Sequence, residues 1–412
     1  MDIPWIRSQF PSLDLQVAGR PAVFFDGPGG TQVPRRVVEA MSDYLLHANA
    51  NTVGAFETSR RTDRMLIEAH AAMADFLNCA PEEVVFGANM TTLTFAASRA
   101  IARDLRPGDE IVVTRLDHDA NVSPWVALEE QGVVVRRADI HTEDCTLDMD
   151  DLRAKVTPRT RLVAVGYAAN AVGTINDVAE IVRMAHAAGA WAWIDAVHYA
   201  PHGSIDVGAL DCDFLVCSPY KFFGPHAGVM FGKRALLERL RPYKLRASTE
   251  ALPARWETGT LCHEVLAGVT GAVDYLAELG RRASPARESR RERLAAAYNV
   301  IRAYERSLAG PLICGLHEIP GLTFYGIREP ARFEWRCPTV AVTVRGHTPL
   351  ELATRLGERG IFTWDGNYYA LDLTERLGVE ANGGLLRLGL VHYNTREEVE
   401  RVLEELRSIA VT

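Results

Sequence analysis

The pattern that most limits the fold is a regular alternation of short apolar runs with helical segments between residues 84 and 232. Strands that are almost continuously apolar and separated by helices are typical of a mostly parallel sheet covered on both faces. The sequence therefore predicts an α/β large domain with a mostly parallel, seven-stranded sheet. We expect its strands at Val84–Gly87, Glu110–Thr114, Val133–Arg137, Arg161–Tyr167, Trp191–Asp195, Phe214–Ser218 and Gly228–Gly232, and helices at Thr91–Arg103 and Asp177–Ala188.

A different pattern follows from residue 281, and it predicts a smaller α+β domain. A long charged amphipathic helix is expected from Arg281 onward. Strands near 322–325, 338–345 and 385–390 then alternate with helices near 349–359 and 396–409. Because 412 residues exceed the size at which one core keeps growing, two domains are expected. The predicted division is an N-terminal segment that packs with the small domain (1–20), a large domain (21–280) and a small C-terminal domain (281–412).

Charge and composition exclude several classes of protein. The net charge of −8 argues against a nucleic acid or an anionic membrane as the main partner. No apolar run approaches the roughly 18 residues of a membrane span, and the start lacks the features of a signal peptide. Seven scattered cysteines give neither a disulfide framework nor a zinc spacing. We expect a cytoplasmic protein with free thiols and no metal site.

Two residues at predicted strand ends indicate chemistry. Asp195 ends one buried strand and Lys221 follows the next, and ligands of open α/β sheets bind outside such strand ends. Apolar surroundings would lower the pKa of the Lys221 amine and favour imine formation. Taken singly, Asp195 also fits a turn cap and Lys221 a surface residue. Together they supply the imine-forming lysine and the acid opposite the ring nitrogen that pyridoxal 5'-phosphate (PLP) requires.

Eight motifs extend this interpretation over nearly the whole chain. They are FFDGPGG near the start, GAFETS at 54–59, LDHDANVSPW at 116–125, YAANAVGT at 167–174, WIDAVH at 193–198, IDVGALDCDFLVCSPYKFFGP at 205–225, ETGT at 257–260 and LRLGLVHYNT at 386–395. In this order they resemble the class V aminotransferase family, and within it the branch of cysteine desulfurases and selenocysteine lyases. The resemblance implies the fold type I architecture of PLP-dependent transferases, with PLP as the cofactor.

The resemblance also implies roles for the residues around the cofactor. Lys221 would form the Schiff base and act as the proton base, Asp195 would face the ring nitrogen, and His118 would stack on the ring. The remaining predicted cofactor contacts are Asn170 at the phenolic oxygen, His198 in place of a family glutamine, and Met90, Thr91, Ser218 and Tyr220 around the phosphate. Tyr220 stands where many desulfurases have histidine. Plainer interpretations are a loop histidine for His118, a turn residue for Asn170 and an N-cap for Thr91.

Substrate binding and assembly follow from the same resemblance. Arg387 would clamp the substrate α-carboxylate, for which a planar bidentate donor is suited. Since LRLGLVHYNT is apolar, a carboxylate partner is expected for this arginine, although an exposed arginine is the plainer interpretation. Asn170 and Tyr369 are also predicted to contact the amino-acid substrate. Thr260 would reach the phosphate of the partner subunit, which implies a homodimer.

The sequence departs from the desulfurase pattern in one loop. GIFTWDGNYYALDL at 360–373 contains no cysteine, and Tyr369 aligns with the position of the nucleophile that accepts sulfur. A phenol cannot form a persulfide, because that step requires a thiolate. Cys262 is an alternative thiol, but only His263 stands beside it to lower its pKa.

Several functions therefore stay open. β-Elimination, a C–S lyase reaction on a cysteine-like amino acid, requires the fewest residues, because it needs no cysteine nucleophile. An aminotransferase or epimerase reaction would use the same lysine and arginine, and a true desulfurase would need a non-standard thiol. Outside these, the chain could be an inactive partner protein with the PLP fold, or a nicotinamide dehydrogenase. The glycines of FFDGPGG are too irregular for the dinucleotide fingerprint that a dehydrogenase requires.

Overall fold

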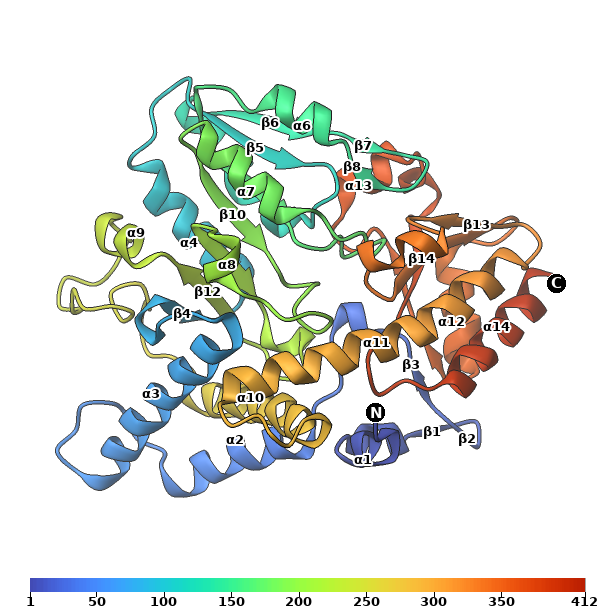
Figure 1. Cartoon of the computed structure of the whole chain (residues 1–412), viewed down its shortest axis with the longest axis horizontal. Coiled ribbons are helices and arrows are strands. Elements are labelled where there is room, and N and C mark those ends of the chain that lie inside the picture. The colour runs from blue at the N-terminus through green and yellow to red at the C-terminus, as the bar shows by residue number, and fades with distance from the viewer. Residues whose placement is uncertain (412) are drawn as a thin grey trace.

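The central sheet has seven strands in the order β4-β12-β11-β10-β9-β5-β6. The computed structural model describes residues 1–411 (Figure 1). Only β12 runs antiparallel to its neighbours in this sheet. The strands are β4 (Val84–Gly87), β5 (Glu110–Thr114), β6 (Val134–Ala138), β9 (Thr160–Gly166), β10 (Trp191–Asp195), β11 (Phe214–Cys217) and β12 (Gly228–Gly232). The prediction of a mostly parallel, seven-stranded sheet is confirmed.

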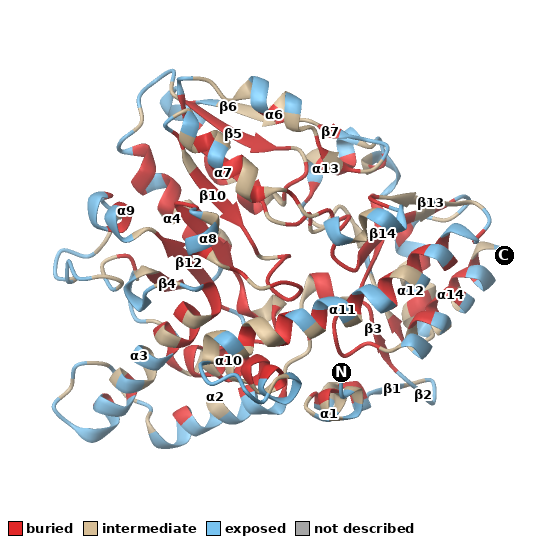
Figure 2. Ribbon diagram, in the orientation of Figure 1, coloured by how far each residue is buried: buried red, intermediate tan, exposed pale blue. Residues whose placement is uncertain are grey.

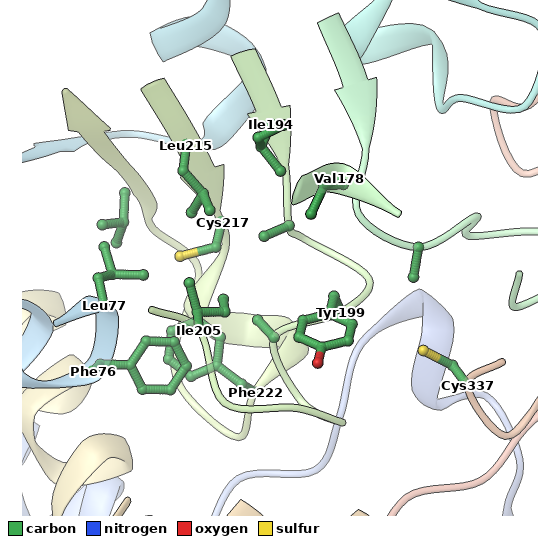
Figure 3. Packing of buried hydrophobic residues seen from close by; sticks show 14 of the residues in the cluster. Phe76, Leu77, Val178, Ile194, Tyr199, Ile205, Leu215, Cys217, Phe222 and Cys337 are labelled. Carbon is green, nitrogen blue, oxygen red and sulfur yellow. The ribbon is translucent and has the colours of Figure 1, made fainter. Parts of the chain in front are cut away.

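Helices cover both faces of this sheet, which explains why its strands are apolar throughout (Figure 2). Side chains alternate between the faces along each strand. On β10, Trp193 packs in the cluster of α4 (Met90–Ala102), while Ile194 packs in the cluster of α7 (Val178–Ala187). Figure 3 shows Ile194, Leu215 and Val178 in this second cluster. It also takes in α3 (Glu57–Leu77) and α10 (His263–Ala283).

The long charged helix begins later than the sequence predicts. Arg281 belongs to the last turn of α10, which ends at Ala283, and α11 runs from Arg290 to His317. The interruption contains Pro285, which disfavours helical backbone in the residue before it. Ser289 then starts α11 as its N-cap, in a capping box with Glu292.

The C-terminal part contains a second sheet, in the order β13-β14-β17-β16, with every neighbouring pair antiparallel. Its strands are β13 (Leu322–Tyr325), β14 (Thr339–Val344), β16 (Trp364–Gly366) and β17 (Leu385–Gly389), and its main helices are α12 (Pro349–Glu358) and α14 (Arg396–Ala410). These elements, apart from β16, share a separate apolar cluster with the C-terminal half of α11. The sequence predicts all of them except β16.

The remaining elements are short or lie outside the two main sheets. They are α1 (Ile3–Ser8), β1 (Gln16–Val17), β2 (Arg20–Pro21), β3 (Val23–Phe24), α2 (Arg35–His47), α5 (Ser123–Val126), β7 (Ile140–His141), β8 (Thr146–Leu147), α6 (Met149–Lys155), α8 (Val207–Leu210), α9 (Arg234–Arg239), β15 (Ile361–Phe362) and α13 (Leu371–Arg376). In residues 1–411, every helix is too short or too polar to cross a membrane.

The N-terminal segment lies between the two parts of the molecule. β3 pairs in parallel with β15, and Arg7 forms an ion pair of 2.9 Å with Glu398 of α14. The Phe10 ring packs edge-on against Tyr275 of α10 and against Tyr393, with centroid distances of 5.2 and 5.1 Å. The segment therefore contacts elements of both parts. The domain limits at residues 20 and 280 stay a prediction.

Phe10→Ala tests the contribution of this segment. The side chain is fully buried, so we expect a loss of about 3–5 kcal/mol in the free energy of unfolding. Urea denaturation followed by tryptophan fluorescence measures it. Leu350→Ala, at a position that is 62% exposed, should lose less than about 0.5 kcal/mol. A Phe10→Ala loss as small as that of the control would contradict the packing described here.

Candidate active site

A cavity of about 450 Å³ opens between the two parts of the molecule, at the carboxyl ends of the large-sheet strands. This volume is in the range of small-molecule sites. Eleven of the twelve predicted site residues line it: Met90, Thr91, His118, Asn170, Asp195, His198, Ser218, Tyr220, Lys221, Tyr369 and Arg387. The twelfth, Thr260, is exposed and lies in a different surface cavity with His70 and Glu257.

The parallel strands explain why these residues meet. Asp195 is the last residue of β10, and Lys221 ends the short 3-10 helix that follows β11. β10 and β11 are parallel neighbours, with Asp195 opposite Val216. His118 follows β5 and Asn170 follows β9. Because parallel strands end at one edge of the sheet, residues that are distant in sequence converge there.

Lys221 is half-buried, and its amine forms no ion pair with any residue in 1–411. Its Nζ donates a hydrogen bond to the carbonyl oxygen of Pro28, and the ammonium lies 4.8 Å from the Tyr220 ring centroid. Burial lowers the Lys221 pKa from 10.5 to about 7, and the positive charge of Arg387 contributes, while Asp195 opposes the shift. The desolvation predicted from the sequence is thereby confirmed. At neutral pH a large fraction of the amine is uncharged and nucleophilic.

Asp195 shares its surroundings with a second carboxyl group that the sequence analysis did not select. Burial raises the pKa of Asp195 to about 6, although the carboxylate accepts a 2.8 Å hydrogen bond from the Val197 amide. Asp117 accepts a 2.6 Å bond from the Gly166 amide, and burial together with Asp195 raises its pKa to about 8. A β-carbon on Gly166 would lie 2.5 Å from the Asp117 carboxylate, so this approach requires glycine. The one indication in the sequence that Asp117 belongs to the site is its position directly before His118.

His118 is held in its neutral form. Its Nδ1 accepts a 3.0 Å hydrogen bond from the Ala120 amide, so the proton of the neutral ring is on Nε2. Burial, with the charges of Lys221 and Arg387, lowers the His118 pKa to about 4. The ring lies 5.4 Å from the Tyr369 ring, centroid to centroid.

The start of α4 provides amide groups at one end of the cavity. Asn89, not Thr91, is the N-cap, since its side chain accepts a 2.8 Å bond from the Thr92 amide. Met90 and Thr91 are the first helical residues, and both line the cavity. Gly228 of β12 lets this turn approach closely, because a β-carbon there would lie 2.3 Å from Asn89. A helix start of this kind is suited to binding a phosphate group.

Arg387 enters the cavity from β17, in the C-terminal part. Its guanidinium donates a 2.8 Å bond to the Asn170 carbonyl oxygen and lies 4.1 Å from the Tyr368 ring centroid. The buried Nε has no hydrogen-bond partner. No carboxylate in residues 1–411 pairs with it, so the carboxylate partner expected from the sequence is not a side chain of the described chain. Asp26, also missed by the sequence analysis, acts on it electrostatically.

The loop after β16 closes the cavity with aromatic residues. Tyr368 and Tyr369 both have positive φ angles, of 56° and 59°. The Tyr369 carbonyl oxygen accepts a 2.6 Å bond from the Asp119 amide, next to His118. The Tyr369 side chain is 72% exposed. No cysteine lines this cavity.

Cys262 lies apart from these residues. It is exposed, and its thiol donates a 3.2 Å hydrogen bond to Glu264. Burial and this carboxylate raise the Cys262 pKa, which disfavours the thiolate. In residues 1–411 all seven cysteines are free, as the sequence predicts.

Comparisons with known proteins agree with this geometry. The family model Aminotransferase class-V matches residues 23–402. A cysteine desulfurase from Dickeya dadantii (strain 3937) is 31% identical over 421 residues, covering 98% of this chain and 96% of the relative. The aminotransferase-like protein FGM3 from Gibberella zeae is 30% identical over 415 residues, covering 98% and 97%. The apo structure of a cysteine desulfurase from Thermococcus onnurineus NA1 superimposes with a TM-score of 0.88, at 26% identity, covering 100% and 99%.

The chain belongs to the class-V aminotransferase family and is a PLP-dependent enzyme of fold type I. The residues present fit this cofactor. Asn170 Oδ1 and His198 Nε2 are buried beside the cavity without hydrogen-bond partners. The Lys221 amine, the Asp195 carboxyl group and the start of α4 supply the donor and acceptor types that an aldehyde, a pyridine nitrogen and a phosphate require.

The pKa of Lys221 predicts the pH dependence of cofactor attachment. Because the folded-state pKa is lowered to about 7, the neutral amine dominates above that pH. The rate of imine formation between the apo-protein and PLP should therefore rise with pH, with an apparent pKa near 7. The absorbance of the imine measures this rate. An apparent pKa near 10.5 would contradict the burial argument.

Two variants complete this experiment. Lys221→Ala should lose the PLP adduct that borohydride reduction makes permanent. Lys233→Ala serves as the control, because that ammonium pairs with Asp211 and Asp213 away from the cavity. It should retain the adduct. A reducible adduct in Lys221→Ala would overturn the assignment of this lysine.

Proposed function

We propose that the protein is a PLP-dependent C–S lyase, which eliminates the β-substituent of a cysteine-like amino acid. The observation that carries the proposal is Tyr369 beside His118, where a sulfur-accepting desulfurase would need a thiol. Desulfuration requires a thiolate to take the sulfur atom, whereas elimination requires only removal of the α-proton and departure of the substituent. Lys221 and His118 would meet the second requirement.

Bound PLP supplies an electron sink that acidifies the α-carbon of an attached amino acid. Lys221 would hold the cofactor, Asp195 would face its ring nitrogen, and His118 would lie on its ring. Met90, Thr91 and Ser218 would bind the phosphate, with Tyr220 beside them. Asn170 and His198 would contact the phenolic oxygen. The raised pKa of Asp195, set by burial, falls toward its ordinary range when a positive ring nitrogen is its partner.

Arg387 would bind the substrate carboxylate. Its buried Nε lacks a partner, and a carboxylate would satisfy it in a charge-assisted bond. The same contact would fix the amino acid between the two parts of the molecule. Asn170, whose carbonyl oxygen already accepts from Arg387, would link substrate and cofactor binding.

The proton steps would use two groups. Lys221 Nζ has a pKa near 7. Once the amine of the substrate has taken its place on the cofactor, the freed Lys221 amine can accept the α-proton. His118 Nε2–H can donate a hydrogen bond to the departing sulfur. The C–S bond would break with its electron pair leaving on sulfur, and the sulfur would take up the proton that Lys221 removed and depart as a thiol. Addition of water to the released enamine then yields a keto acid and ammonia.

Products distinguish this proposal from its alternatives. With cysteine, elimination should release pyruvate, ammonia and sulfide in equal amounts, and desulfuration should release alanine and enzyme-bound sulfur. Transamination would give a keto acid with the sulfur retained, and epimerisation would give only the D-isomer. We expect pyruvate and ammonia from a panel of S-substituted cysteines, by coupled assay. Alanine as the main product would overturn the proposal, and no turnover would favour an inactive partner protein.

Cys262→Ser is the matched control for the thiol alternative. Cys262 is the thiol next to ETGT, and its pKa is raised rather than lowered. The variant should keep the rate of the wild-type protein. A loss of activity would favour a desulfurase that uses this non-standard thiol.

Arg387→Lys tests carboxylate binding. A lysine cannot make the bidentate contact, so we expect kcat/KM for the amino acid to fall by about 30-fold or more. Cysteamine derivatives, which lack the carboxylate, provide the control. Their low turnover should change little between wild type and variant, and an equal loss for both substrates would contradict the role of Arg387.

The same proposal includes a homodimer. Thr260 is exposed and borders an open cavity of about 640 Å³, which shares no lining residue with the active-site cavity. Val53, Phe56 and Ile67 are large exposed apolar residues in the first 70 positions. A second copy would cover such residues and would bring Thr260 to the phosphate of its partner.

A further inference from the structure

A second cluster of reactive side chains lies beside the active site. His198 and His202 are four residues apart in the loop that follows β10, and Cys337 stands shortly before β14. One nitrogen from each ring and the Cys337 sulfur all lie within 4.8 Å of one another, and all three residues are buried. Figure 3 shows Cys337 near Tyr199, which belongs to the same loop. The cysteine spacing alone gave no such site, because the histidine ligands are distant in sequence.

His202 is oriented as metal-binding histidines are. Its Nδ1 is 2.8 Å from Oε2 of Glu305 on α11, and both side chains are buried. This bond leaves Nε2 of His202 free. A carboxylate that holds one ring nitrogen while the other faces an ion is the usual second layer of contacts in such sites.

One buried oxygen of the cluster lacks a partner. Glu305 Oε1 is enclosed without any hydrogen bond. Buried polar atoms of native proteins are normally satisfied, so an unmatched oxygen calls for a ligand. Glu305, His202 and Cys337 also line a cavity of about 20 Å³. This volume accommodates a single ion or a single water molecule.

We propose that His198, His202 and Cys337 bind one thiophilic metal ion, Zn²⁺ or Cu⁺. Two imidazoles and a thiolate suit both ions, and the cavity leaves room for a water molecule as a fourth ligand of Zn²⁺. Binding would release the Cys337 thiol proton to solvent, since the thiolate is the ligand. No oxidation or reduction is needed.

The charges around the cluster discriminate between the two ions. Arg336 is buried next to Cys337, and its guanidinium donates only to backbone carbonyl oxygens, among them those of Ile327 and Thr339. Arg302 and Arg306 also line the small cavity, and the negative groups are Glu305 and the Cys337 thiolate. Cu⁺ would add less positive charge to these surroundings than Zn²⁺, and a hydroxide in place of water would lower the charge that bound Zn²⁺ adds.

The ion would connect the two parts of the molecule. His198 also lines the active-site cavity, and Cys337 leads into β14, the neighbour of the strand that carries Arg387. Metal binding would therefore fix the His198 ring and join the loop after Asp195 to the C-terminal sheet. The metal site would have this structural role whichever reaction the active site performs.

Metal titration of the purified PLP-loaded protein tests the proposal. After dialysis against a chelator, the protein should bind one Zn²⁺ or Cu⁺ per chain, measured by competition with a chromophoric chelator under anaerobic, reducing conditions. Cys337→Ser should weaken binding at least 100-fold. Glu305→Gln should weaken it about 10- to 100-fold, the usual effect of removing a carboxylate that orients a histidine ligand. Cys212→Ser, at another buried free cysteine, should bind as the wild type does.

Co²⁺ in place of Zn²⁺ gives a readout that does not depend on the variants folding. A thiolate ligand produces an intense sulfur-to-cobalt absorption band in the wild-type protein, and Cys337→Ser should abolish it. Wild-type protein whose affinities for Zn²⁺ and for Cu⁺ both equal those of Cys337→Ser would overturn the proposal. A water molecule would then be the occupant of the small cavity.

Discussion

Burial of the Lys221 amine is the constraint around which the site is arranged. An ammonium group in this position would be costly, and the chain provides a carbonyl oxygen, an aromatic ring and a distant carboxylate rather than an ion pair. The same low polarity shifts Asp195 and Asp117 toward their protonated forms and His118 toward its neutral form. The protein therefore holds its titratable groups with little net charge among them, apart from Arg387. An anionic ligand with a carboxylate and a phosphate is the natural complement.

The sequence predicts the large sheet closely because its physical signal is local. Runs such as residues 191–194 are apolar at every position, which is typical of a strand buried on both faces. The same reasoning identifies Asp195, which follows this run at the end of its strand, and Lys221, which ends the short 3-10 helix after the next strand. The sequence does not predict β16, because its three residues show no strand pattern of their own. They form a strand through pairing with β17. The predicted start of the long helix at Arg281 is wrong because charged residues continue through the connection between α10 and α11. Pro285 lies in this connection, and Ser289 is the N-cap of α11.

The sequence does not identify site residues whose role depends on contacts with residues far away in the chain. Asp26 and Asp117 stand in motifs that the sequence analysis quoted, but only the fold brings one near Arg387 and the other near Asp195. The cluster of His198, His202 and Cys337 likewise exists only after the C-terminal part has packed on the large sheet. A single sequence identifies which residues bear reactive groups at strand ends. It does not contain the electrostatic coupling between them, because that depends on separations and burial.

The pairing of β3 with β15 has a consequence for synthesis of the chain. Residues 23–24 leave the ribosome long before their partners Ile361 and Phe362 are made. Arg7 waits in the same way for Glu398. Until residues 361–362 are made, Phe24 and Phe25, which are buried in the folded protein, lack the strand that β3 pairs with. Pairing of β3 with β15 is therefore a late step of folding during synthesis, because it requires the C-terminal part.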